Sequence, residues 1–114
     1  MALNSLLARL LKRTGITAPD TIVVGPGRGL HFDPGPSNAD YASGDNELPV
    51  QQALVDHLQP GAVFYDVGAN VGFLTVLGAR LVGPSGAVYA FEPVASNAAY
   101  VHRNAQANHF AQVQ

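Results

Sequence analysis

The chain has 114 residues and a mass of 11.9 kDa, which is the size of one domain. Hydrophobic residues make up 47% of it and charged residues 12%, so enough apolar surface is present to drive folding. A net charge of −2 argues against duplex nucleic acid as a partner, because proteins that bind it carry a surplus of basic residues. Since the sequence has no cysteine, disulfides, thiolate zinc sites and cysteine nucleophiles are excluded.

The first residues predict an amphipathic helix. Leucines at positions 3, 6, 7, 10 and 11 repeat at helical spacing, so residues 3–13 are expected to place one apolar stripe across the body of the protein. Weak binding of this helix to a membrane surface or to a partner is the alternative. Its basic residues follow the apolar ones, which is the wrong order for a secretory signal, and no apolar run reaches the length of a membrane span. We therefore expect a cytoplasmic protein.

Turn-forming residues are concentrated between residues 16 and 47. Two short strands, 21–24 and 29–32, are predicted to form a hairpin around the glycine-containing loop 25–28. Residues 33–45 are rich in proline, glycine and asparagine and predict a polar loop. Residues 1–47 are thus expected to be an N-terminal extension made of a helix, a hairpin and a loop.

Residues 48–114 show a different pattern, in which short apolar strands alternate with helices. We predict a helix over 48–58, a strand over 62–66, a helix over 71–81, a strand over 87–91 and the start of a strand over 110–114. Between the last two strands, Ser96 is expected to cap a helix that runs to about residue 107, and Asn108 to end it in a left-handed conformation. This order is typical of parallel βαβ units, and the continuously apolar strands predict a sheet covered on both faces.

The segment DVGANVG, residues 66–72, lies where the first of these strands gives way to a helix. In open α/β sheets, ligands bind at this end of the strands. Asp66 could accept a hydrogen bond from an ammonium or hydroxyl group, and Gly68 permits a sharp turn and leaves no side chain in the way of a ligand. Asn70 could cap the helix and tolerates unusual backbone angles, and Gly72 would admit a ligand or the sheet. Glu92, after the next strand, could accept hydrogen bonds from both hydroxyls of a ribose.

The spacing of the glycines bears on which nucleotide is bound. A dinucleotide-binding G-x-G-x-x-G segment would need glycine where Asn70 and Phe73 stand. The sequence fits instead the pattern D/E-x-G-x-G-x-G, with Asn70 at the position of the second glycine. This pattern is the first motif of Rossmann-like methyltransferases that use S-adenosylmethionine. Glu92 would serve NAD equally well, so a fragment that binds NAD or another nucleotide is the alternative.

Several segments together resemble a known family. The motif YDVGANVGF, the segment GPSGAVYAFEP, and the helix ending in Arg103 and Asn104 with Asn108 beyond it are similar to FkbM-type S-adenosylmethionine-dependent methyltransferases, over roughly residues 44–114. The resemblance implies that the motif residues line the methionine end of the cofactor and that Glu92 holds its ribose. The cofactor-binding residues so implied are Asp66, Gly68, Ala69, Asn70, Gly72, Glu92 and Pro93.

The same resemblance implies an α/β, Rossmann-like class I methyltransferase fold and transfer of a methyl group to a hydroxyl of a small molecule or sugar. Such a sheet has seven strands ordered 3-2-1-4-5-7-6, and the sequence up to Gln114 reaches only the third. We expect the substrate-binding face to lie beyond it and the 114-residue chain alone to be inactive; a non-catalytic product is the further alternative. The first strand would then be an open edge through which copies could associate.

Other polar residues have less specific interpretations. Glu47 could approach the methionine end, but a solvated acid before Pro49 is the preferred interpretation. Thr75 is expected to pack or to bond to the backbone. The four histidines, at positions 31, 57, 102 and 109, show no metal-ligand spacing, so no metal is implied. No catalytic residue is assigned.

Overall fold

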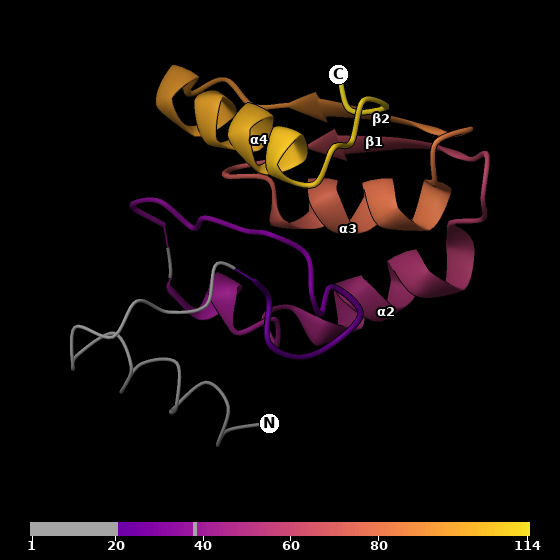
Figure 1. The fold of residues 1–114 in the computed structure, drawn as a ribbon, viewed down its shortest axis with the longest axis horizontal. Coiled ribbons are helices and arrows are strands. Elements are labelled where there is room, and N and C mark those ends of the chain that lie inside the picture. Colours follow the sequence, from indigo (N-terminus) through magenta and orange to yellow (C-terminus); the bar gives the residue numbers. More distant parts are fainter. Residues whose placement is uncertain (1–20, 38) are drawn as a thin grey trace.

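The computed structural model describes residues 21–37 and 39–114, and Figure 1 shows how their elements are arranged. A short 3-10 helix η1 (Ala39–Ala42) precedes α2 (Leu48–His57), β1 (Val63–Val67), α3 (Phe73–Val82), β2 (Ala87–Phe91) and α4 (Ala95–Ala107). The predicted helix over residues 3–13 lies outside the described residues. Of the helices in the described part, none has the length and apolar character needed to span a bilayer.

The sheet is parallel, as the alternating strands and helices predict. Val63 of β1 lies opposite Ala87 of β2, and Val67 lies opposite Phe91. On the other side of β2, the backbone N–H of Val88 donates to the carbonyl of Gln112 at 2.9 Å, and Val113 forms a single parallel bridge with Val88. The predicted strand over 110–114 is thus reduced to one bridge, and it places β2 between β1 and the C-terminal segment.

Helix α3 is the centre of the fold. Figure 1 shows it between the two strands on one side and α2 on the other, with α4 packed alongside. Because it has neighbours on several sides, its residues are buried around most of its circumference: Phe73, Val76, Leu77 and Ala79 are all at most 2% exposed. Gly78 allows close approach to β1, since a Cβ there would lie 2.4 Å from the ring of Phe64.

The second face of the sheet is apolar and exposed. Alternate residues of a strand point to opposite faces, so Phe64 and Asp66 point toward α3 while the residues between and beside them point away. Val63, Tyr65 and Val67 are 57%, 63% and 81% exposed, and Phe91 of β2 is 52% exposed. The prediction that both faces are covered is therefore wrong for the described residues, whose helices all pack on one face.

The segment before α2 joins the same core. Ile22, Leu30 and Phe32 are buried against Val71, Phe73 and other apolar residues at the start of α3. The predicted hairpin is present only as one antiparallel bridge, between Thr21 and His31, supported by the hydrogen bond from Ile22 N to Leu30 O at 2.9 Å. Regular strands do not form here, because Val24 N donates to Ser43 O at 3.0 Å and so bonds to the segment before α2 instead of to the second predicted strand.

Helix α4 ends at Ala107, as predicted, but both of its caps differ from the prediction. The helix begins two residues earlier than a cap at Ser96 implies, with Val94 as its N-cap and no side-chain cap hydrogen bond. At its other end Asn108 has a φ of −101°, and the left-handed residue is His109, with a φ of 57°. The Asn108 side chain binds another segment: its amide oxygen accepts from His31 N and its amide nitrogen donates to His31 O, both at 2.8 Å.

Candidate functional site

The loop after β1 is tightly wound and bonded to the end of β2. Gly68, Asn70 and Gly72 all have positive φ, of 79°, 54° and 94°. The backbone N–H groups of Gly68 and Ala69 both donate to the carbonyl of Phe91, at 2.8 and 3.0 Å. A Cβ at Gly68 would have nothing within 4 Å, so the space beside it is open, as the sequence predicts.

Glu92 connects the two strand ends through its carboxylate. Its Oε1 accepts from the backbone N–H of Asn70 and its Oε2 from that of Val94, both at 3.0 Å. An ionised carboxylate has about four acceptor positions, so each oxygen retains one for a ligand. Glu92 therefore fixes the left-handed turn at Asn70 while it can still accept two hydroxyl hydrogen bonds.

Asp66, the last helix-facing residue of β1, is only 6% exposed. Burial raises the pKa of its carboxyl above the usual value, and a hydrogen bond from Thr75, with 2.6 Å between Thr75 Oγ1 and Asp66 Oδ2, opposes that rise. The expectation that Thr75 packs in the interior is confirmed, since it is fully buried, but its hydroxyl donates to the Asp66 side chain from the first turn of α3 and not to the backbone. Nothing in the local sequence pattern distinguishes this threonine from a core residue.

A small cavity of about 50 Å³ lies beside the loop. Asp66, Gly68, Ala69 and Asn70 line it, so the structure brings together four of the predicted cofactor-binding residues. Glu47, which precedes α2, is exposed, as the preferred interpretation of a solvated acid predicts, and it also contributes to the lining of this cavity.

Gly72 has a different role from the predicted one. It is the N-cap of α3, a position that the sequence suggests for Asn70. A Cβ at Gly72 would lie 3.1 Å from Cα of Val101. The absence of a side chain at Gly72 therefore lets the backbone of α4 approach closely, and not a ligand or the sheet. The glycine spacing correctly indicates a close approach, but the partner lies in a helix some thirty residues further along the chain.

Asn104 of α4 is a positioning residue to which sequence reasoning assigns no role. It is 2% exposed, and its Nδ2 donates to the carbonyl of Val71 in the loop at 2.8 Å. The same amide group pairs with both backbone groups of Asp33, accepting from the N–H at 2.8 Å and donating to the carbonyl at 3.0 Å. The segment after Phe32 is thereby held over the loop, and there Ser37 Oγ donates to Asn70 Oδ1 at 3.3 Å.

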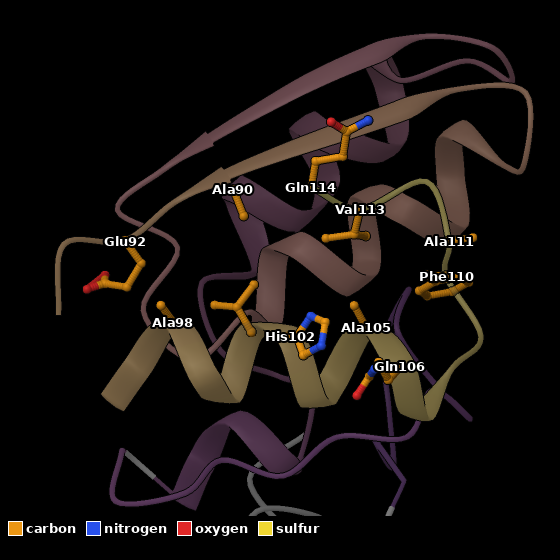
Figure 2. Close-up of a pocket in the computed structure, with 11 residues that line it drawn as sticks. Ala90, Glu92, Ala98, His102, Ala105, Gln106, Phe110, Ala111, Val113 and Gln114 are labelled. Carbon is orange, nitrogen blue, oxygen red and sulfur yellow. The ribbon is translucent and has the colours of Figure 1, made fainter. Parts of the chain in front are cut away.

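A larger cavity of about 470 Å³ lies between β2, α4 and the C-terminal segment, as Figure 2 shows. Glu92 stands at one end of it, and alanine and valine side chains of α4, together with Phe110, form apolar walls. Because Glu92 also bonds to Asn70, which lines the small cavity, this one carboxylate links the two spaces. Pro93 is exposed and lines neither.

Metal ligands are not gathered near this site. Across residues 21–37 and 39–114, no three or more histidine, cysteine, aspartate and glutamate side chains lie together in a group that could hold a metal ion. The chemistry that the described residues offer is hydrogen-bond acceptance from a cation or from hydroxyl groups, next to apolar walls.

Comparison with known proteins agrees with this arrangement at the level of the fold. No family profile matches the chain, and no curated protein matches it. Its structure is similar to that of precorrin-6y C5,15-methyltransferase from Geobacter metallireducens GS-15, with a TM-score of 0.52 and 20% identity over 60% of this chain and 37% of that one. It is also similar to a SAM-dependent methyltransferase from Aquifex aeolicus, with a TM-score of 0.50 and 22% identity over 73% of this chain and 45% of that one.

In both comparisons the chain spans less than half the length of the similar structure. At these identities the likeness shows the fold. The predicted α/β, Rossmann-like arrangement of methyltransferases is therefore confirmed over the part of the fold that the chain covers.

Proposed function

We propose that this chain is the S-adenosylmethionine-binding part of a methyltransferase. The observation that carries the proposal is the hydrogen bond from Asn70 N to Glu92 Oε1, which joins the glycine-rich loop after β1 to the carboxylate after β2. It supports a ligand with two polar ends, one at the small cavity beside Asp66 and one at Glu92. A methionine moiety attached to a ribose has two such polar ends, the amino-acid group and the ribose hydroxyls.

The residues on either side fit the parts of that cofactor. Asp66 presents a carboxylate to the small cavity, where it would face the ammonium group of the methionine end. The free acceptor positions of Glu92 would take the two ribose hydroxyls. Gly68 leaves room for the chain between them. When bound, the cofactor supplies an electrophilic methyl group on a sulfonium, and the protein residues hold it in place for a nucleophile.

The acceptor that we propose is a hydroxyl oxygen of a small molecule or sugar, as in FkbM-type methyltransferases. The support is the motif resemblance alone, in DVGANVGF and FEP at this spacing. The activity belongs to a larger methyltransferase fold, since the chain spans 37% and 45% of the two similar structures.

Isothermal titration calorimetry of the 114-residue chain tests the proposal, with S-adenosylmethionine and NAD as separate ligands. Saturable binding of S-adenosylmethionine is expected, and Glu92→Gln should weaken it about tenfold or more, because hydrogen bonds to a charged group contribute about 1.5–3 kcal/mol. Asp56→Asn, which removes a carboxylate from the exposed face of α2, is the control and should bind like the wild type.

Two outcomes would contradict the proposal. Tighter binding of NAD than of S-adenosylmethionine would favour the dinucleotide alternative. A folded chain that binds neither ligand would favour a non-catalytic product.

A further inference from the structure

A third cavity, of about 470 Å³, lies at the C-terminal end of α3 and is called the α3-end cavity below. Figure 1 shows that α3 runs against the direction of β1 and β2, so this end of the helix and the loops after the two strands lie at opposite ends of the sheet. The lining of the α3-end cavity includes Gly29, Leu30, Arg80, Gly83, His109 and Phe110. Neither Asp66 nor Glu92 lines it, so a ligand bound here would be separate from the proposed cofactor.

Arg80, in the last turn of α3, gives this cavity a positive charge. Its Nη1 donates to the carbonyls of Pro26 and Arg28, at 3.1 and 2.8 Å. Its Nη2 and Nε donate no hydrogen bond to any other described residue, and none of the described residues that line the cavity is acidic. The two bonds at Nη1 orient the guanidinium, and they leave its Nε–Nη2 edge for a ligand. Such an edge presents two parallel N–H groups, which match two oxygens of a phosphate or carboxylate.

Glycines keep the space around this guanidinium open. Gly29 belongs to the glycine-containing loop before it, has a φ of 85°, and would place a Cβ 4.0 Å from Arg80 Nη2. On another side of the cavity, a Cβ at Gly83 would have nothing within 4 Å. The loop over residues 25–28, which the sequence predicts only as a hairpin turn, therefore also holds Arg80 through its carbonyls and leaves room for a ligand beside it.

Hydrogen bonds satisfy carbonyl groups at the two helix ends beside the cavity. Unpaired carbonyls at a helix C-terminus carry partial negative charge and would oppose an anion. The carbonyl of Ala79 in α3 accepts from Gly83 N and from Gln112 Nε2, both at 3.1 Å. At the end of α4, the carbonyl of Gln106 accepts from His109 N at 2.9 Å. These bonds reduce that opposition, and the guanidinium is the full charge in the lining.

The rest of the lining is apolar and restricts the class of ligand. Leu30 is 3% exposed, Phe110 is half-buried, and Pro84 lies at the exposed side. A volume of about 470 Å³ is within the range of sites for small organic molecules, and an inorganic ion would fill only part of it. The cavity thus offers one site for an anionic group and apolar surface for the remainder of the same molecule.

We propose that the α3-end cavity binds an organic anion, with its phosphate or carboxylate group on Arg80 and its apolar part against Leu30 and Phe110. The Nε–Nη2 edge of Arg80 donates to two oxygens of the anionic group. The imidazole of His109, at the end of α4, supplies a further N–H donor from the exposed side.

Amide NMR titrations of the isotope-labelled 114-residue chain test this site with four probes. Phenyl phosphate and benzoate carry a ring with either anionic group, inorganic phosphate is the anionic group alone, and benzyl alcohol is a ring without charge. Phenyl phosphate or benzoate should produce saturable shifts at Gly29, Gly83 and His109 and bind at least about tenfold more tightly than inorganic phosphate, because the ring is removed from water. The tighter of the two identifies the anionic group, and benzyl alcohol should bind at least about tenfold more weakly than either.

Three variants assign the binding to named side chains. Arg80→Gln should weaken binding of the tighter anion about tenfold or more, since it removes two hydrogen bonds to a charged group. His109→Gly should weaken it about threefold, and it leaves Arg80 in place while relaxing the left-handed backbone at position 109, so a folding defect is not expected. Arg103→Gln makes the same charge change on α4, where Arg103 lies over the Tyr100 ring and lines none of the three cavities, and should bind like the wild type.

Several results would overturn this inference without affecting the proposed function. Shifts confined to the loops after β1 and β2, or no saturable shifts with either organic anion, would show that the α3-end cavity is not the site. Benzyl alcohol that binds as tightly as phenyl phosphate would show that charge is not recognised. Equal losses in Arg80→Gln and Arg103→Gln would show that only the overall charge of the chain matters. Failure to bind S-adenosylmethionine, in contrast, would overturn the proposed function and leave these tests intact.

Discussion

Asn104 offers the sharpest test of how the site is held together. Its side chain makes three hydrogen bonds to backbone groups of two distant segments, Val71 in the loop and Asp33 before η1. Replacing it by alanine would leave these groups without that partner in a region where Asn104 itself is 2% exposed. At about 1 kcal/mol for each hydrogen bond, the expected loss is about 3 kcal/mol in the free energy of unfolding.

Urea unfolding followed by circular dichroism measures this loss directly. In a domain of this size, it should lower Tm by more than about 10 °C. Asn97→Ala on the same helix is the matched control and should stay within about 0.5 kcal/mol of the wild type. Amide hydrogen exchange at Asp33 should also become faster in Asn104→Ala. An Asn104→Ala variant as stable as the control would refute the argument that this amide joins the loop to the N-terminal segment.

Three further predictions follow from the site and the sheet. Burial raises the pKa of Asp66 in the folded chain, so as the pH rises its carboxyl loses its proton first in the unfolded chain, and the free energy of unfolding should fall between the unfolded and the folded pKa. In urea titrations at several pH values, Asp66→Asn should remove this decline. An unchanged pH profile in the variant would contradict the prediction. Gly68→Ala should lower the free energy of unfolding by about 1–2 kcal/mol, from its positive φ alone. Gly72→Ala should lower it by at least about 1 kcal/mol more, because its Cβ would contact the backbone of α4 at short distance. Equal losses of stability in thermal unfolding would argue against that contact. The exposed apolar strand β1 should make the chain associate as its concentration rises, and Val67→Thr should reduce this in sedimentation velocity, an effect that would be absent if β1 played no part.

Most of the secondary structure after residue 47 could be predicted from the sequence. The strand predicted over 87–91 agrees with β2 at both ends, and the helix predicted over 48–58 is one residue longer than α2. Apolar runs between glycine and proline turns are local signals, so they need no knowledge of distant contacts. The motif at the end of β1 was likewise predictable, because its spacing describes a single loop.

What could not be predicted depends on residues far apart in the sequence. Asn104 and Asp33 are 71 residues apart, and Asn108 and His31 are 77 residues apart. No spacing rule relates such pairs, and for the same reason Asn108 could be mistaken for the left-handed end of α4 when its side chain binds another segment. Thr75 reaches Asp66 across the strand–helix turn, a contact that becomes visible only once α3 is packed against the sheet.

The exposed face of the sheet shows a different limit. An apolar strand indicates that a face is suited to burial, but the sequence does not say what covers it. The described helices all pack on the face to which Phe64 and Asp66 point, whereas Tyr65 and Val67 lie on the open one. The uncovered face is thus a property of the arrangement of the elements.

Amide NMR of the isotope-labelled chain, titrated with S-adenosylmethionine, tests the central claim most directly. The account predicts saturable shifts at Gly68, Asn70 and Glu92, because these residues form one bonded unit at the strand ends, and it predicts that Glu92→Gln largely abolishes the shifts. NAD at the same concentrations should produce much smaller changes. A well-dispersed spectrum that does not respond to S-adenosylmethionine would contradict the claim that these residues form a binding site for it.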